Sequence, residues 1–235
     1  MMFERPHHQR IAQVLSSLNA RLLLENNCLF GGGTAIALRY GEFRESIDMD
    51  FLISDVPGYR NLRQLLTTPQ GIQPILKADA KPLSLARDIR ADQYGIRTML
   101  LVAGHTIKFE IVLEGRIKLS PPQKNDDICG IATLSLLDMA TSKLLANSDR
   151  WNDEGAFNRD LIDLAMMNLP LPQLRKAVSK AEGAYGTSIL ADLEKAITKT
   201  QSKKEWLERC IQAMDINIPK AVIWKKIRRL RRLCS

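Results

Sequence analysis

Two aspartates stand two residues apart, shortly after a run of glycines, and this spacing suits chemistry on a phosphate. The sequence reads Gly31-Gly32-Gly33-Thr34 and, further on, Asp48-Met49-Asp50. In a β-strand, residues i and i+2 point to the same side, so Asp48 and Asp50 would present their carboxylates together. Mg²⁺ prefers hard oxygen ligands and completes its shell with substrate phosphates. The pattern therefore predicts a magnesium site for nucleotide chemistry.

The glycine run has two interpretations. A helix N-terminus carries free N–H groups that bind anions. Thr34 opens a helical stretch that ends near Gly41, so the glycines before it could cradle a phosphate. The simpler alternative is a helix-entry turn that needs glycine only for a positive φ. Three consecutive glycines exceed what such a turn requires, which favours the phosphate site.

Glu110 is the natural third carboxylate. Two-metal nucleotidyl transfer needs several carboxylates that converge on ions about 4 Å apart. Glu110 lies on the polar side of the alternating segment 105–113, which could pair beside the strand of Asp48 and Asp50. The alternative is that Glu110 is half of a surface ion pair with Lys108.

The elements that must position these residues are strands. Residues 49–53 are typical of a buried strand. Residues 96–102 and 105–113 predict a hairpin that turns at Ala103-Gly104. Prolines, charges and weak periodicity in residues 69–95 indicate only short strands and loops.

The N-terminal part predicts one helix over residues 9–25, where apolar residues recur at helical spacing. His7-His8 before it is interpreted as part of a flexible polar terminus rather than a metal site. The four cysteines are far apart and form no C-x-x-C pair, which favours reduced thiols over zinc or a disulfide framework. No apolar run approaches the roughly 20 residues that span a bilayer, and no signal core follows the start. We expect a cytoplasmic protein without membrane attachment.

The second half of the chain has the pattern of helices only. Candidate helices cover residues 133–149, 157–168, 172–184, 187–199, 203–214 and 218–233. Strand signals end near residue 113, so we predict an α/β (α+β) domain with a mixed sheet over 1–125 and an all-helical domain over 126–235.

Positive charge is concentrated at one place. The formal net charge is +8, and residues 220–232 hold seven Lys and Arg with no acid. These cations cover one side of a predicted helix whose other side is apolar. A docked terminal helix with a solvated polar face explains the pattern, and so does an RNA-binding patch. Trp224 could stack on a base or belong to the core.

Several motifs together resemble one family. Residues 32–41, GGTAIALRYG, and the later R-x-S-x-D-x-D-F over 44–51 resemble the AbiEii/AbiGii-type nucleotidyltransferase toxins of the DNA polymerase β-like superfamily. In the helical half, residues 141–150 and 159–164 resemble the family's lysine motif and its R/K-D-x-x-D-L motif. The order of the motifs along the chain strengthens the resemblance.

The resemblance implies roles for individual residues. The implied metal ligands are Asp48, Asp50 and Glu110, for Mg²⁺ or Mn²⁺. The implied nucleotide-binding residues are Gly32, Gly33, Thr34, Arg44, Ser46, Lys143 and Arg150. Lys143 and Asp160 are also implied in catalysis, Asp160 as the functional acid of the last motif. Because Lys143 and Arg150 are seven apart, one helix face could present both to a triphosphate, although a solvated edge is the alternative.

Two features depart from the family pattern. Many relatives carry a histidine directly after the glycine at position 41 and have one residue fewer before the arginine, whereas Glu42 and Phe43 occupy that stretch here. The third carboxylate, Glu110, is longer than an aspartate by one methylene. Both departures concern how the substrate is positioned rather than the metal site.

The resemblance implies a nucleotidyltransferase that moves an NMP from an NTP onto a hydroxyl acceptor. It would bind the NTP in a cleft between the two domains and act as the toxin of a toxin–antitoxin or phage-defence pair, with a cognate antitoxin. We expect a tRNA 3′ end as the acceptor. The alternatives are modification of a protein or a small molecule, or a non-catalytic nucleotide- or RNA-binding protein. The basic C-terminus argues against a cationic drug as the acceptor.

Overall fold

A computed structural model describes residues 3–234 of the chain. It divides into two compact units. The sheet unit comprises the residues up to Arg39 together with Ser46–Ser135. The helical unit comprises Tyr40–Glu45 and the residues from Leu136 onward.

The sheet unit contains a mixed five-stranded sheet in the order β1-β2-β5-β4-β3. Its strands are β1 (Leu29–Gly31), β2 (Asp48–Ile53), β3 (Ser84–Ala91), β4 (Gly95–Val102) and β5 (His105–Leu113). Strands β2 and β5 are parallel, and the other neighbours are antiparallel. A short ribbon follows, formed by β6 (Asp127–Ile128) and β7 (Ile131–Ala132). The predicted mixed sheet is confirmed.

The core of the sheet unit lies against the apolar face of β2 and β5. Because side chains alternate along a strand, Met49 and Phe51 are buried while Asp48 and Asp50 remain half-buried on the other face. The ring of Phe51 lies 5.3 Å, centroid to centroid, from those of both Phe30 and Phe109.

The predicted hairpin of β4 and β5 is confirmed. Ala103 and Gly104 both adopt a positive φ, +48° and +79°. This is the backbone that a two-residue turn requires to match the twist of the strands.

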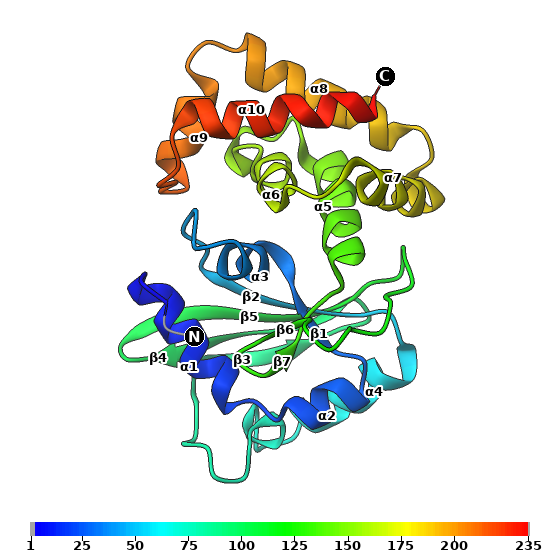
Figure 1. Cartoon of the computed structure of the whole chain (residues 1–235). Coiled ribbons are helices and arrows are strands. Elements are labelled where there is room, and N and C mark those ends of the chain that lie inside the picture. Colours follow the sequence, from blue (N-terminus) through cyan, green and yellow to red (C-terminus); the bar gives the residue numbers. More distant parts are fainter. Residues whose placement is uncertain (1–2, 235) are drawn as a thin grey trace. The chain divides into compact units, whose positions relative to one another are not determined.

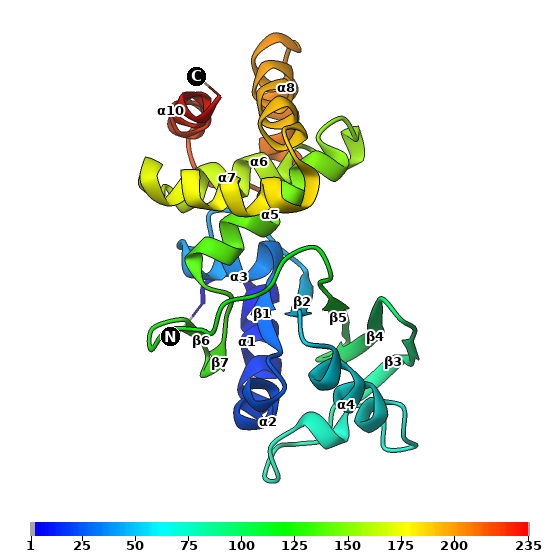
Figure 2. The same ribbon diagram turned by 90° about the vertical axis from the view of Figure 1, so that its right-hand side faces the viewer.

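Helices cover both sides of this sheet. They are α1 (Pro6–Ser17), α2 (Ala20–Glu25), α3 (Gly32–Arg39) and α4 (Val56–Leu66), with a 3₁₀ turn at Gln73–Ile75. In both ribbon views α3 lies on one side of the strands, and α2 and α4 lie on the other (Figure 1 and Figure 2).

The predicted single helix over residues 9–25 is wrong, because the chain breaks between α1 and α2. The backbone N–H of Asn19 donates to the carbonyl of Ile75 at 2.9 Å, and the Asn19 side chain accepts from the N–H of Leu22. Asn19 is therefore the N-cap of a second helix. The interpretation of His7-His8 as a flexible terminus is also wrong, since both residues belong to α1 and His8 is fully buried.

The helical unit confirms all six predicted helices. They are α5 (Leu136–Arg150), α6 (Arg159–Met167), α7 (Leu171–Tyr185), α8 (Ser188–Ser202), α9 (Trp206–Ala213) and α10 (Lys220–Leu230). Short 3₁₀ turns occur at Glu154–Ala156 and Arg231–Leu233. Helix α5 packs against α6, α7 and α8, and α10 packs against α6. Figure 2 looks nearly along α10 and shows α8 lying apart from it.

Candidate active site

Strand pairing brings the three predicted carboxylates onto one face of the sheet. In the parallel register of β2 and β5, Asp50 lies opposite Glu110 and Asp48 lies opposite Lys108. Residues opposite each other in a ladder point to the same side. The predicted pairing of the Glu110 strand beside the strand of Asp48 and Asp50 is confirmed.

Glu110 is held by two cations. Its Oε1 accepts from Arg97 Nε at 2.5 Å, and its Oε2 lies 2.6 Å from Lys108 Nζ. Burial acts to raise the pKa of Glu110, but the contacts with Lys108 and Arg97 outweigh it and lower the pKa overall. The ion pair that the sequence offered as an alternative role is therefore present, and it keeps Glu110 ionised, as a metal ligand must be.

The glycine run packs against the aspartate pair. Gly32 has φ +68°, and a Cβ added there would collide with the Asp50 carboxylate and come within 2.9 Å of Asp50 Cβ. A Cβ on Gly31 would lie 2.7 Å from Leu134 and 2.8 Å from Leu52. Glycine is thus required at Gly32 for its positive φ and for the close approach of Asp50 to the start of α3.

Thr34 and Ser46 connect the start of α3 to the start of β2. The buried Thr34 hydroxyl donates to the carbonyl of Asp48 and lies 2.8 Å from Ser46 Oγ. The backbone N–H of Ser46 donates to His8 Nε2 at 3.1 Å. The hydroxyl of Thr34 is therefore engaged within the protein, where it fixes the position of the Asp48 backbone.

The donor set at Asp48 and Asp50 fits Mg²⁺. This ion is commonly held by one or two carboxylates and keeps waters and substrate phosphates as its other ligands. Within residues 3–234 no three or more His, Cys, Asp or Glu side chains form a ready-made metal cluster. Because Asp50 packs closely against Gly32, the position of its carboxylate is restricted.

Lys108 supplies positive charge beside these carboxylates. Burial acts to lower the pKa of Lys108, but the hydrogen bond and charge of Glu110, and the charges of Asp50 and Asp48, raise it overall. A protonated Lys108 therefore balances part of the negative charge on this face of the sheet.

The helical unit holds a second group of predicted residues. We call it the buried charge network; its members are Arg44, Lys143, Arg150, Asp160 and Asp163. Lys143 Nζ lies 2.9 Å from Asp160 Oδ1 and 2.8 Å from Asp163 Oδ2. Arg150 donates twice to Asp160, at 2.7 and 3.0 Å. Arg44 donates twice to Asp163, at 2.7 and 2.9 Å.

Charge outweighs burial within this network. Burial acts to lower the pKa of Lys143, but Asp160 and Asp163 raise it overall. For Asp160 the direction is opposite: burial acts to raise its pKa, and Lys143 and Arg150 hold it well below its ordinary value. Both shifts favour the charged forms of Lys143 and Asp160. By residue type the network contains three basic and two acidic side chains.

The structure brings together Lys143 and Arg150, as their spacing on α5 predicted, at the carboxylate of Asp160. The alternative of a solvated edge is wrong for Lys143, which is only 5% exposed. Asp163 and its pairing with Arg44 were not predicted. The signal was present in the R-D-x-x-D motif, because i and i+3 place Asp160 and Asp163 on one face of α6.

The fold recurs in solved structures of other proteins. Two solved structures from Helicobacter pylori share it: one assigned as a nucleotidyltransferase (TM-score 0.51, 17% identity, covering 97% of this chain and 94% of that one) and JHP933 (TM-score 0.55, 15% identity, covering 99% and 95%). At such low identity this similarity concerns the fold alone. A comparison with curated protein sequences finds no match.

The sequence then identifies the family. Residues 13–226 match the profile of the nucleotidyl transferase AbiEii toxin family of type IV toxin–antitoxin systems. The chain belongs to this family and is a nucleotidyltransferase, which confirms the resemblance seen in its motifs. None of the helices within residues 3–234 is long and apolar enough to cross a membrane.

Proposed function

We propose that this toxin transfers an NMP from an NTP onto a hydroxyl of an acceptor, releases pyrophosphate, and uses the 3′ end of a tRNA as the acceptor. One observation carries the proposal of nucleotidyl transfer at this site. Asp48 and Asp50 share a face of β2, and Asp50 packs against Gly32 at the start of α3. Carboxylates beside a helix N-terminus suit a metal-bound triphosphate.

Asp48 and Asp50, with Glu110 as the third carboxylate, are the residues that would hold Mg²⁺ or Mn²⁺. When bound, such an ion polarises phosphoryl oxygens and makes a hydroxyl a stronger nucleophile. Lys108, Arg97 and the Gly32 contact keep Glu110 and Asp50 in place for this role.

The N–H groups at Gly32, Gly33 and Thr34 are proposed to bind triphosphate oxygens, with Ser46 supporting the turn. Lys143, Arg150 and Arg44 are proposed to supply positive charge to the phosphates. Asp160 would orient Lys143 and Arg150, since it contacts both. The ion pairs with Asp160 and Asp163 hold the three cations in place relative to one another within the helical unit.

The basic helix α10 supports an RNA acceptor, because phosphate contacts supply most of the sequence-independent affinity for nucleic acids. Membership of a type IV toxin–antitoxin family supports a cognate antitoxin as the physiological partner. A protein or small-molecule acceptor would use the same carboxylates but not the basic helix.

Incubation of the full chain with each labelled NTP, Mg²⁺ and total tRNA tests the proposal. We expect label at the RNA 3′ end for at least one NTP, loss of transfer on chelation of the metal, and no labelling of RNA whose 3′ hydroxyl has been oxidised. Label on protein instead of RNA would show that the acceptor is a protein. Absence of transfer to RNA from every NTP would contradict the proposal.

A further inference from the structure

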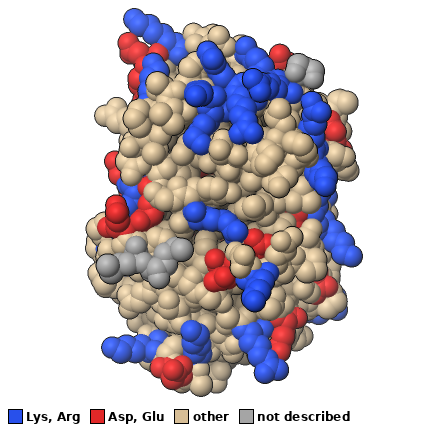
Figure 3. Space-filling view, in the orientation of Figure 1, with Lys and Arg blue, Asp and Glu red and all other residues tan. Residues whose placement is uncertain are grey.

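The outward side of α10 carries cations without acidic neighbours. Ile223, Ile227 and Leu230 form the buried stripe of this helix. Lys225 and Arg228, three residues apart on the opposite side, are exposed and have no ion-pair or hydrogen-bond partner in the part of the chain that the structure describes. In the space-filling view Lys and Arg side chains gather over the surface that α10 forms (Figure 3).

Other basic residues of this segment are engaged within the unit. Arg229 donates to Asn168 at 2.8 Å, Arg231 contacts Thr198 at 3.4 Å, and Lys220 pairs with Glu208. These contacts hold the helix in place. The outward pair is thus left to meet a ligand, while its neighbours serve the packing of α10.

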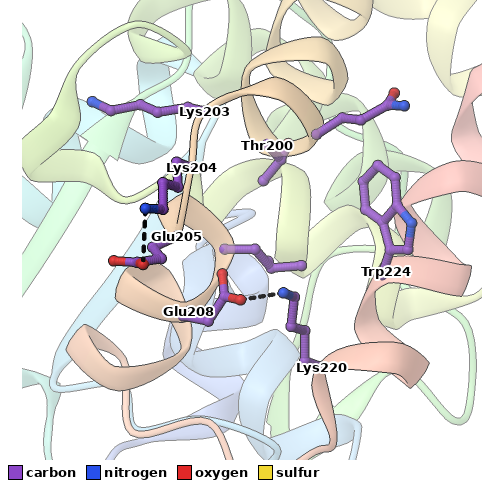
Figure 4. Close-up of a pocket in the computed structure, with 9 residues that line it drawn as sticks. Thr200, Lys203, Lys204, Glu205, Glu208, Lys220 and Trp224 are labelled. Carbon is purple, nitrogen blue, oxygen red and sulfur yellow. Dashed lines mark hydrogen bonds and ion pairs between the residues drawn. The ribbon is translucent and has the colours of Figure 1, made fainter.

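A cavity of about 320 Å³ opens where α10 meets α8 and α9, and it is lined on the α10 side by Lys220 and Trp224. Trp224 of α10 forms one wall and Leu207 contributes apolar surface, while Thr200, Gln201, Glu205, Glu208 and three lysines form the polar remainder. The three lysines are ion-paired, Lys203 with Glu154, Lys204 with Glu205 and Lys220 with Glu208, so the wall opposite Trp224 is polar and nearly balanced in charge. Figure 4 shows the indole of Trp224 across the hollow from Lys204 and Glu205. The volume is at the small end of ligand pockets, about 300–1,000 Å³, which suits a group the size of one nucleotide.

Trp224 differs from the nearby Trp206, which has a structural role. Trp206 is fully buried, stacks on Phe157 and donates its indole N–H to Asn158 at 2.7 Å. Trp224 is half-buried, and its indole N–H has no partner among residues 3–234. Lys225 and Arg228 follow Trp224 by one and four residues in the same helix. An aromatic face together with cations that can meet the backbone is the combination that binds single-stranded nucleic acids.

We propose that α10 binds an unpaired stretch of the RNA acceptor, with one base stacked on Trp224 in the cavity and the flanking phosphates on Lys225 and Arg228. This deepens the proposed function and rests on its assignment of RNA as the acceptor. A base can enter the cavity only when it is unpaired, so single-stranded RNA is preferred to a duplex of the same length.

Binding of a labelled, unstructured short RNA to the full chain, followed by fluorescence anisotropy in a salt series without NTP, tests this. Trp224→Ala should weaken binding about tenfold, and Trp224→Phe should lose less because it keeps a ring to stack on. The double variant Lys225→Gln/Arg228→Gln should reduce the slope of log affinity against log salt concentration by about 1.4, because it removes two phosphate contacts to a single strand. Circular dichroism checks that each variant is folded.

The matched control is Arg175→Gln/Lys176→Gln, which removes two exposed cations from α7 and should leave both the affinity and the salt slope close to those of the unchanged chain. Variants of α10 that behave like this control, or a duplex that binds as well as the single strand, would overturn the inference. NMP transfer by the unchanged chain is measured separately. If NMP transfer fails while RNA binding depends on α10, the proposed function is wrong but α10 still binds RNA. If NMP transfer occurs while RNA binding does not depend on α10, only the proposed RNA surface is wrong.

Discussion

Arg44 and Asp163 form a buried, two-fold hydrogen-bonded ion pair, at 2.7 and 2.9 Å, although 119 residues separate them in the sequence. The pair attaches the segment Tyr40–Glu45 to α6 within the helical unit. Asp163 also contacts Lys143, so this carboxylate connects a residue of the first motif to the lysine motif.

Asp163→Asn should destabilise the protein by about 3 kcal/mol or more, because it leaves two buried cations short of an anion. Arg44→Lys should lower the free energy of unfolding by a smaller but measurable amount, since an ammonium cannot make the two parallel hydrogen bonds of a guanidinium. Urea unfolding measures both free energies. The control is Arg21→Gln, which removes the exposed pair with Glu25 and should change the free energy by at most about 1 kcal/mol. An equal effect of Asp163→Asn and the control would contradict the buried network.

Gly32→Ala should abolish NMP transfer, because its Cβ must displace the Asp50 carboxylate. Gly41 also has a positive φ, +79°, but has open space around it, so Gly41→Ala should cost only backbone strain of about 1 kcal/mol. Gly183→Ala, within α7 and also in open space, should stabilise the protein by about 1 kcal/mol. Transfer rates and unfolding are compared across the three variants. Equal transfer rates in the Gly32 and Gly41 variants would show that the close packing of Asp50 against Gly32 is not needed for transfer.

The contribution of Asp160 to stability should depend on pH in the acid range. Its pKa is lowered in the folded protein, so the unfolded chain binds the proton more readily and stability falls as pH drops below the ordinary aspartate value of 3.8. The free energy that separates the unchanged chain from Asp160→Asn should be constant above about pH 5 and shrink below it. Urea unfolding at a series of pH values measures this difference. A difference that grows on acidification would contradict the direction of the pKa change.

Glu110→Gln should raise the Mg²⁺ concentration needed for half-maximal transfer by about tenfold or more, because it removes a proposed metal ligand while keeping its size. Arg97→Gln should cause a smaller shift, since Arg97 acts only through Glu110. Asp92→Asn serves as the control, because Asp92 contacts Arg97 but lies outside the carboxylate face. An unchanged Mg²⁺ requirement in Glu110→Gln would show that Glu110 forms ion pairs but does not bind the metal.

The carboxylate strand and its neighbour were predictable because local patterns determine them. Alternation along β5 and the buried strand after Asp48 gave the polar and apolar faces correctly, and the helical spacing gave α5 to α10. Strand β3 lies within residues 69–95, for which the sequence predicts short strands and loops without placing them. Its residues 84–91 are mostly exposed, and their pairing with β4 is interrupted by two register shifts. Without a buried face there is no alternation to detect.

Long-range contacts explain the other differences. Apolar spacing continues across Leu18 and Asn19, so the periodicity alone predicts one helix. The break shows in the N-cap bond from Leu22 N–H to the Asn19 side chain and in the hydrogen bond of Asn19 N–H to the Ile75 carbonyl. His8 was assigned to a polar terminus because nothing local shows that it accepts from Ser46 N–H. The two carboxylates of α6 were visible in a motif, but their partner Arg44 lies in another part of the chain.

The most direct test of the central claim is the rate of NMP transfer from labelled NTP to RNA by Asp48→Asn and Asp50→Asn. The matched control is Asp88→Asn, which changes an exposed aspartate on β3 of the same sheet. We predict that the first two variants stay folded and lose transfer almost completely, while the control transfers at the rate of the unchanged chain. Transfer that persists in the double variant Asp48→Asn/Asp50→Asn would contradict the assignment of this pair as the catalytic centre.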